Sequence, residues 1–90
     1  MNYIGGHILE ILDKVEREPG IDTYRLCVKP DNKKQIDYRK RETARQLAED
    51  GFILSIPAGM TERHTLTDKG RELLEHILAI KVLVMMGGGE

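Results

Sequence analysis

The chain has 90 residues and a formal charge of −1, a length that fits one domain with a modest core and excludes a large enclosed active site. The charge is uneven, because residues 1–24 carry −3, residues 25–46 carry +5 and residues 47–90 carry −3. A basic centre in an acidic chain predicts a surface that faces a polyanion. The single cysteine, Cys27, excludes an internal disulfide, and no basic segment leads into an apolar run at the N-terminus. We therefore expect a cytoplasmic protein without a signal peptide.

The first elements are predicted from the spacing of apolar residues and from residues that cap or end helices. Residues 8–15 place apolar side chains at i, i+3, i+4 and i+7, which predicts an amphipathic helix over residues 3–18 that ends at Pro19-Gly20. Asp22 is the expected N-cap of a short helix over residues 23–28. That helix contains the cysteine, which we expect to be partly buried and inert rather than reactive.

A polar loop and a third helix follow. The segment PDNKKQ, residues 30–35, is rich in turn formers and is predicted to be a loop. Asp37 is the expected N-cap of a helix over residues 38–50, and Gly51 has the place after that helix where a left-handed residue ends it.

The last third of the chain predicts a hairpin and a long helix. Residues 52–56 and 62–66 are the two expected strands, joined by a turn at residues 57–60. Thr67 is the N-cap of a helix over residues 67–86. The expected order is therefore α-α-α-β-β-α, in one domain over residues 1–90 that ends in a disordered tail at 87–90.

Two segments carry a resemblance to a known family. LAEDGFI (residues 47–53), followed by the hairpin and HTLTDKGRELL (residues 64–74), resembles the winged-helix DNA-binding domain, in particular small MarR- and PadR-like regulators of bacteria, archaea and phages. In these proteins a recognition helix ends in leucine, polar residues, glycine and two apolar residues, and the hairpin, called the wing, ends in an LTxxG step into a C-terminal helix. The resemblance implies an α+β, mostly α, winged helix-turn-helix fold with a long C-terminal helix. It also implies sequence-specific binding of double-stranded DNA by a homodimeric transcriptional regulator.

Each residue of the matching segments has a physical role. Gly51 allows the positive φ that turns a helix into a strand, and Leu66 is expected to close the base of the hairpin. Gly70, near the start of the last helix, costs about 1 kcal/mol relative to alanine. A close approach by a neighbouring backbone would explain a glycine there.

The third helix is the predicted DNA-contacting element, since a recognition helix enters the major groove. At 100° per residue, Lys40, Thr43, Ala44 and Leu47 point inward, Tyr38, Arg41, Glu42 and Arg45 point outward, and Arg39 and Gln46 lie on a flank. Arginine is suited to guanine edges and to phosphates. The predicted DNA-binding residues are Lys33, Lys34, Tyr38, Arg39, Arg41, Arg45, Gln46 and, beside the wing, Arg63.

An alternative is that these basic residues form an ordinary solvated face. Lys40 stands where relatives usually have an apolar residue, and Glu42 either accepts from cytosine N4 or repels the DNA. The wing is weakly basic because Glu62 offsets Arg63, so its contacts are expected to be minor. His64 is expected to be exposed and without a role, rather than to titrate beside a phosphate.

The last helix has two apolar stripes. One consists of Leu73, Ile77, Ile80 and Val84, and the other of Leu74, Leu78, Val82 and Met85. The chain's own core needs one stripe, so the second predicts a two-fold dimer with an interface of Ile77, Leu78, Ile80, Val82, Val84 and Met85. The alternative is that the first helix covers the second stripe. The apolar run at 77–86 is too short for a bilayer, which needs about 20 residues.

Enzyme chemistry has no support in the sequence. The three histidines show no metal-binding spacing, and no nucleophile elbow or phosphate loop is present. We therefore expect no enzyme activity, cofactor, metal, membrane or small-molecule ligand. The other candidate function is a winged helix used as a protein-protein interaction module of a phage or mobile-element assembly, because Glu42 and the apolar last helix fit such a role.

Overall fold

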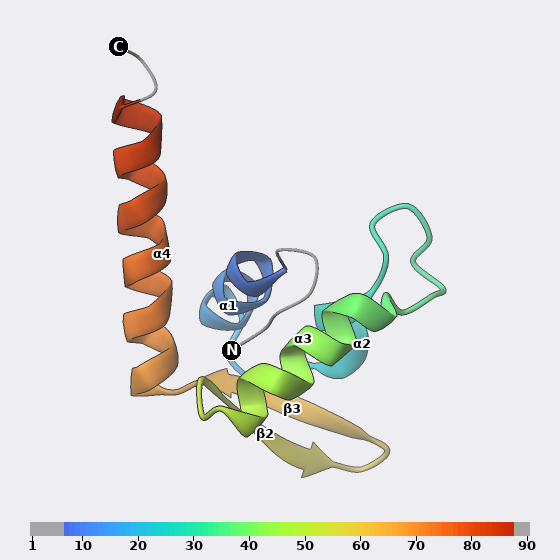
Figure 1. The fold of residues 1–90 in the computed structure, drawn as a ribbon. Helices are drawn as coiled ribbons and strands as arrows, with labels where there is room; N and C mark the ends of the chain where they lie inside the picture. The colour runs from blue at the N-terminus through green and yellow to red at the C-terminus, as the bar shows by residue number, and fades with distance from the viewer. Residues whose placement is uncertain (1–6, 88–90) are drawn as a thin grey trace.

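The computed structural model describes the backbone of residues 7–87 and the side chains of residues 7–80. In chain order its elements are α1 (Ile8–Arg17), β1 (Ile21–Asp22), α2 (Thr23–Cys27), α3 (Tyr38–Glu49), β2 (Ile53–Ala58), β3 (Thr61–Leu66) and α4 (Asp68–Gly87). This described part is an α+β fold with four helices and one three-stranded antiparallel sheet in the order β1-β3-β2. Figure 1 shows α1, α2 and α3 on one side of the sheet, with α4 upright beside α1 and extending well past it.

The three predicted N-caps are confirmed by their hydrogen bonds. The carboxylate of Asp22 accepts from the backbone N–H of Arg25 at 2.7 Å, and that of Asp37 accepts from the N–H of Arg39 at 2.9 Å. The hydroxyl of Thr67 accepts from the N–H of Gly70 at 3.0 Å. Each bond satisfies a donor that the first helical turn leaves free, so these helices begin where their caps predict. The predicted start of α1 at residues 3–6 lies outside the described residues.

One strand was not predicted. Ile21 and Asp22 form β1, which pairs antiparallel with β3 through Ile21↔His64 and Asp22↔Arg63. Two residues are too few to display an alternating pattern, and Asp22 gives the stronger signal of a helix cap. The observed order is therefore α-β-α-α-β-β-α, and the short strand ties the start of α2 to the hairpin.

The hairpin is longer than predicted, because its turn contains only Gly59 and Met60. Pro57 and Ala58, predicted to lie in the turn, belong to β2 and pair with residues of β3. The carbonyl of His64 accepts a hydrogen bond from the N–H of Gly20, next to β1. Backbone groups alternate in direction along a strand, so the N–H and C=O groups of Arg63 and Thr65 point the other way, toward β2. By the same alternation the nitrogen of Pro57 faces the open edge of the sheet. Proline is tolerated there, because no ladder bond needs its missing N–H.

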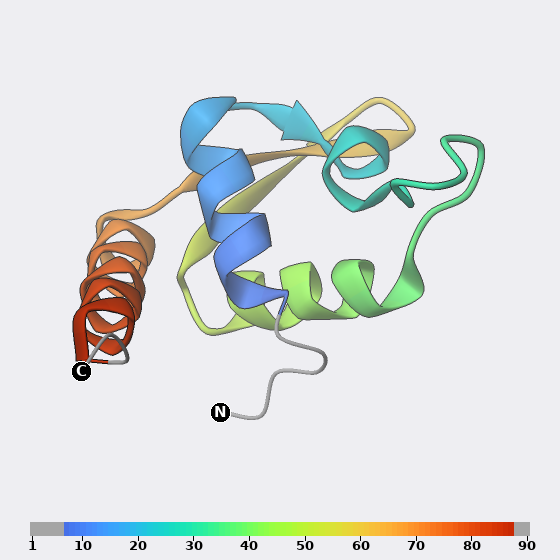
Figure 2. The ribbon, with the colours of Figure 1, turned by 90° about the horizontal axis from the view of Figure 1, so that it is seen from above.

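The core is built from every helix and from the sheet. Its buried apolar residues are Ile11, Leu12, Val15, Ile21, Leu26, Cys27, Ala44, Leu47, Phe52, Ile53 and Leu74. Figure 2 shows α1 in the middle of the molecule between α4 and the α2–α3 side, and α1 contacts α2, α3, α4 and β3. The apolar stripe of α1 is therefore the centre around which the other helices are fixed.

Two glycines have the roles expected of them. Gly51 has φ = 82° at the end of α3, in the left-handed region that favours glycine. A Cβ at Gly70 would lie 1.9 Å from the carbonyl oxygen of Phe52 and 2.9 Å from Cδ1 of Leu66. The α4 backbone thus lies directly against the start of β2, and half-buried Leu66 fills the remaining space at the base of the hairpin.

The last helix extends one residue further than predicted. α4 ends at Gly87, so assigning that residue to a disordered tail was wrong, and the other tail residues, 88–90, lie outside the described part. Within the described residues, no helix combines the length and apolar character needed to cross a bilayer.

Candidate nucleic-acid interface

The orientation of α3 agrees with the predicted helical faces. Lys40, Thr43, Ala44 and Leu47 are buried, while Tyr38, Arg39, Arg41 and Arg45 are exposed and Glu42 and Gln46 are half-buried. The side of α3 that packs on the core is thus separated from a strongly polar side. What the polar side offers to a ligand depends on which of its charges are already paired.

Lys40 has an ion-pair partner on another helix. Its ammonium lies 2.7 Å from Oε1 of Glu10 on α1, and Lys40 is only 4% exposed. Burial by itself would raise the pKa of Glu10, but hydrogen bonds from Lys40 and His7 outweigh it and lower that pKa. An ion pair therefore fills the position where an apolar residue was expected, and it ties the beginning of α3 to α1.

The charge of Arg45 is offset by two carboxylates of its own helix. Its Nε donates to Oε2 of Glu42 at 3.0 Å, its Nη2 donates to Oε1 of the same carboxylate, and its Nη1 donates to Glu49. The hydrogen bonds from Arg45 lower the pKa of Glu42 and, in return, the pKa of Arg45 is raised. Gln46 also donates to Glu42, at 3.4 Å. Although Arg45 points outward as predicted, it belongs to a compensated cluster.

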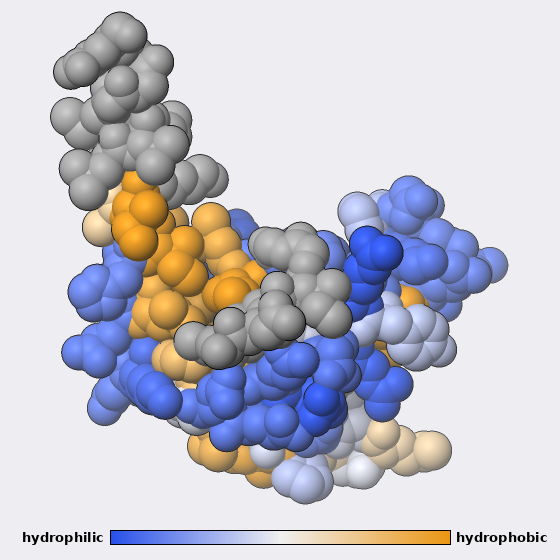
Figure 3. All heavy atoms as spheres, viewed as in Figure 1, coloured by the Kyte–Doolittle hydropathy of each residue, from blue (hydrophilic) through white to orange (hydrophobic). Residues whose placement is uncertain are grey.

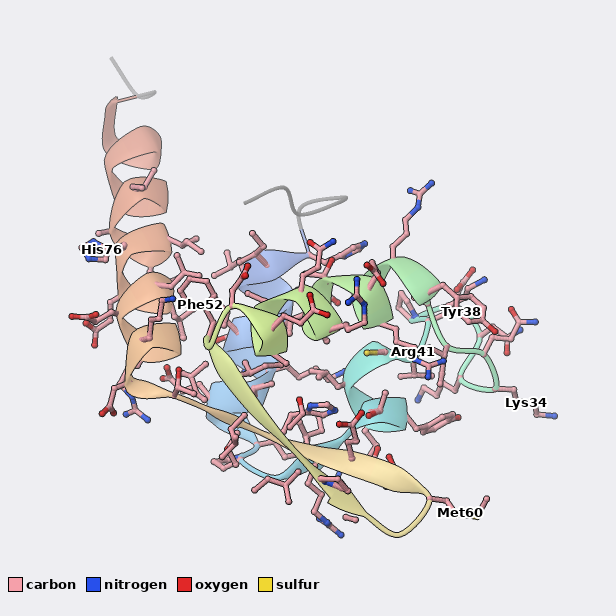
Figure 4. All side chains as sticks on the ribbon, turned by 60° about the horizontal axis from the view of Figure 1, so that its bottom comes forward. Lys34, Tyr38, Arg41, Phe52, Met60 and His76 are labelled. Carbon is pink, nitrogen blue, oxygen red and sulfur yellow. The ribbon has the colours of Figure 1, made fainter. Side chains whose placement is uncertain are left out.

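The charges at the N-terminal half of α3 are different. Within residues 7–80, no hydrogen bond or ion pair engages the guanidinium of Arg39 or of Arg41, and both residues are exposed. Tyr38 is 76% exposed at the same end. Figure 4 shows Tyr38 and Arg41 beside the loop that carries Lys34. The available positive charge is therefore concentrated where α3 begins.

The connection between α2 and α3 extends this basic end. It comprises residues 28–37 and is closed by an isolated bridge between Val28 and Ile36 and by a hydrogen bond from the N–H of Lys29 to the carbonyl of Gln35 at 2.9 Å. Lys33 and Lys34 are exposed on this loop. A turn between two such helices usually has three or four residues, so the longer loop carries these lysines away from the helix pair.

A groove of about 890 Å³ separates α3 from the hairpin. Its lining residues include Tyr38, Arg41, Glu42 and Arg45 from α3, Thr23 and Tyr24 from α2, and Ser55, Met60, Thr61, Glu62 and His64 from the hairpin. The groove thus offers several hydroxyl groups and two arginines, the kinds of side chain that commonly contact phosphate and sugar, together with the carboxylates of Glu42 and Glu62.

His64 is buried, and its predicted exposure was wrong. It is only 4% exposed, with Nε2 2.8 Å from the hydroxyl of Thr23 and Nδ1 2.7 Å from that of Ser55. Burial lowers its pKa. Side chains alternate along a strand, so inward-facing Leu66 two residues later was the signal for its position. Because Thr23 carries no charge to stabilise an imidazolium, unlike the aspartate of a catalytic triad, we assign these contacts a structural role.

Arg63 does not join the other predicted site residues. By the same alternation it lies on the sheet face opposite His64, and its Nη1 donates to the carbonyl of Gly20 at 3.2 Å. The structure therefore brings together the residues of α3 and its preceding loop and leaves Arg63 on a different face.

The predicted dimer residues are only partly available. Ile77 packs partly against the chain's own core, whereas Leu78 is 43% and Ile80 is 60% exposed. The side chains of Val82, Val84 and Met85 lie outside the described part. Leu74 of the second stripe is buried in the core cluster with residues of α1. The alternative that the first helix covers the second stripe therefore holds for Leu74 but not for the exposed Leu78. Figure 3 shows apolar surface on the coloured part of α4 and onto the adjoining body.

Residues 7–80 contain no group of three or more histidine, cysteine, aspartate or glutamate side chains able to hold a metal ion. No family model matches the chain, and neither a curated protein nor a solved structure matches it.

Proposed function

We propose that the chain is a winged-helix protein that binds double-stranded DNA in a sequence-specific manner as a homodimeric transcriptional regulator. The observation that carries the proposal is the basic end of α3, where Arg39 and Arg41 stand exposed next to Lys33 and Lys34 and their guanidinium groups have no partner among the described residues. A helix preceded by another helix and followed by a hairpin is the arrangement that the LAEDGFI and LTDKG motifs imply.

The dimensions fit this function. The 12 residues of α3 make a helix of about 18 Å, and a major groove about 12 Å wide admits one helix. When α3 lies in the major groove of the DNA, the adjoining sugar-phosphate backbone of the DNA lies in the protein groove between α3 and the hairpin. There the hydroxyls of Tyr24 and Thr61 and the guanidinium of Arg41 are available to its phosphates.

The residues divide into two tasks. Arg41 and Arg39 supply planar donors for guanine edges and for phosphates near the start of α3. Lys33 and Lys34 supply sequence-independent contacts to the flanking backbone. The tip of the hairpin has no charge, since it consists of Gly59 and the fully exposed Met60, so its electrostatic contribution is small.

Dimerisation rests on the part of α4 that extends beyond the body. Leu78 and Ile80 expose apolar surface there, and a second copy related by a two-fold axis covers it with the same residues. Such a dimer presents two α3 helices to successive major grooves of a pseudo-palindrome. The variant Ile80→Glu is expected to be monomeric by mass measurement and to bind duplex DNA more weakly. A dimer of unchanged stability in this variant would remove α4 from the interface.

The function is tested by selecting bound sequences from a random DNA pool and titrating binding with salt. Each phosphate contact contributes about −0.9 to the slope of log K against log salt concentration, so Arg41→Ala should flatten the slope by about that amount. Arg45→Ala is the matched control, from the same face of α3, and should change the slope little because Arg45 is already paired. Binding of the wild type that is absent or independent of salt would overturn the proposal.

The second candidate is an interaction module for another protein. It is favoured by apolar surface on the hairpin, where Leu54 is 52% and Ile56 is 51% exposed on the sheet face away from α3. A monomeric free protein that co-purifies with a different protein and shows no salt-dependent DNA binding would support this candidate.

A further inference from the structure

Both oxygens of the Glu42 carboxylate accept hydrogen bonds from neighbours on α3. Its Oε2 accepts from Nε of Arg45 at 3.0 Å, and its Oε1 accepts from Nη2 of Arg45 and, at 3.4 Å, from Gln46. This two-point arrangement fixes the plane of the guanidinium. Glu49, one turn further along, holds Nη1 of the same guanidinium, so the three side chains form a cluster with a formal charge of −1.

The cluster stands in the path assigned to the DNA backbone. Both Glu42 and Arg45 line the groove between α3 and the hairpin, whereas Glu49 does not. A phosphate in this groove would meet a guanidinium whose donors are directed at carboxylates. Of the outward arginines of α3, Arg45 is therefore the one whose positive charge is already neutralised.

We propose that Glu42 withholds Arg45 from phosphate and thereby limits how tightly the protein binds DNA of any sequence. The inference rests on the proposed DNA-binding function and assigns a new role to one residue of the site. Sequence-independent affinity comes mainly from cations that neutralise phosphates and release counterions. Holding one arginine in an intrahelical pair lowers this affinity without removing the exposed Arg39 and Arg41.

One substitution opens the pair without disturbing the fold. The side chains of Arg45 and Glu42 are 54% and 39% exposed, and ion pairs in such positions contribute little to folding. In Glu42→Gln, the neutral amide no longer competes with a phosphate for the guanidinium. Arg45 then keeps Glu49 as its one ionic partner, so its Nε and Nη2 can turn into the groove, and α3 remains folded because its core-facing residues are unchanged.

The test is a salt titration of a fluorescently labelled duplex of random sequence with the wild type and with Glu42→Gln. One added phosphate contact makes the slope of log K against log salt steeper by about 0.9. If the wild type and Glu42→Gln bind equally at 1 M salt, this difference in slope makes Glu42→Gln bind about eightfold more tightly at 0.1 M salt.

Two control variants separate release of Arg45 from the change in net charge. Glu49→Gln removes the same charge and one partner of Arg45 but leaves the pair with Glu42, so its affinity should change less than twofold. The double variant Glu42→Gln/Arg45→Gln should return to the wild-type slope. Circular dichroism of each variant verifies that the helices are intact.

The outcomes distinguish the inference from the function on which it rests. If the wild type binds with a clear salt slope and Glu42→Gln behaves like Glu49→Gln, the role of Glu42 is overturned and the DNA-binding function stands. If neither the wild type nor Glu42→Gln binds the duplex at 50 mM salt, both are overturned. A steeper slope in Glu42→Gln that persists in the double variant would also overturn the inference, because Arg45 would not be its source.

Discussion

Replacing Gly70 by alanine tests the tight junction between β2 and α4. A Cβ at this position would lie 1.9 Å from the carbonyl oxygen of Phe52, and contacts under 3.0 Å essentially never occur, so the backbones must separate by about 1.1 Å (3.0 − 1.9). The same carbonyl accepts from the N–H of Thr67 at 3.2 Å and from its hydroxyl at 3.0 Å. The displacement therefore breaks the bond from the N–H, while the hydroxyl keeps its shorter donation to the carbonyl of Gly51 at 2.7 Å.

The expected magnitude follows from opposing contributions. One lost hydrogen bond costs about 1 kcal/mol and overpacking costs about 1–3 kcal/mol, while the helix gains about 1 kcal/mol from losing a glycine. The net loss of about 1–3 kcal/mol in the free energy of unfolding corresponds to a fall in Tm of roughly 5–25 °C for a domain of this size.

Urea denaturation followed by circular dichroism at 222 nm measures this loss. Ala79→Gly, at an exposed position of the same helix, is the control, and it should lose only the propensity difference of about 1 kcal/mol. Helix propensity alone predicts that Gly70→Ala stabilises the protein. A denaturation midpoint equal to or above that of the wild type would therefore refute the reasoning from close contact.

Three further predictions concern buried polar groups. Glu10→Ala leaves the buried ammonium of Lys40 without its partner and should lower the free energy of unfolding by about 1–2 kcal/mol, given that Glu10 is half exposed. In urea titrations Lys40→Met should lower the free energy of unfolding by less than Glu10→Ala does. The reverse order would contradict the ion pair as the stabilising contact. Because burial lowers the pKa of His64 below 6.5, its contribution to stability is present above that pH and is lost as pH falls through the lower folded-state value. The difference in Tm between wild type and His64→Gln should therefore narrow from pH 7.5 to pH 5, and a constant difference would exclude this titration. Burial raises the pKa of the Cys27 thiol to about 11, so a thiol reagent at pH 7.5 should label the native protein far more slowly than the urea-unfolded protein, with equal rates contradicting burial.

Local chemistry was sufficient to predict most element boundaries. Asp22, Asp37 and Thr67 each cap the predicted helix, since a cap depends on a few adjacent residues. Gly51 ended α3 for the same reason. β1 was missed because its pairing joins residues more than 40 positions apart, and neither Ile21 nor Asp22 alone indicates a distant partner.

The candidate site was predictable in direction but not in its pairing of charges. Helical periodicity correctly separated the inward from the outward residues of α3. It did not reveal that Arg45 is held by Glu42 and Glu49, because their side-chain conformations decide which charges meet. The burial of His64 required the register of the hairpin, which places that ring against α2 and Ser55.

Pro57 has a consequence for how the protein behaves at high concentration. β2 is the longer of the two edge strands of the sheet and exposes Leu54 and Ile56 on one face, a combination that invites strand-by-strand growth into aggregates. Because the nitrogen of Pro57 faces that edge, β2 offers an incoming strand no backbone N–H near its C-terminal end. This residue therefore makes the hairpin a poor template for fibril formation while leaving its apolar face accessible.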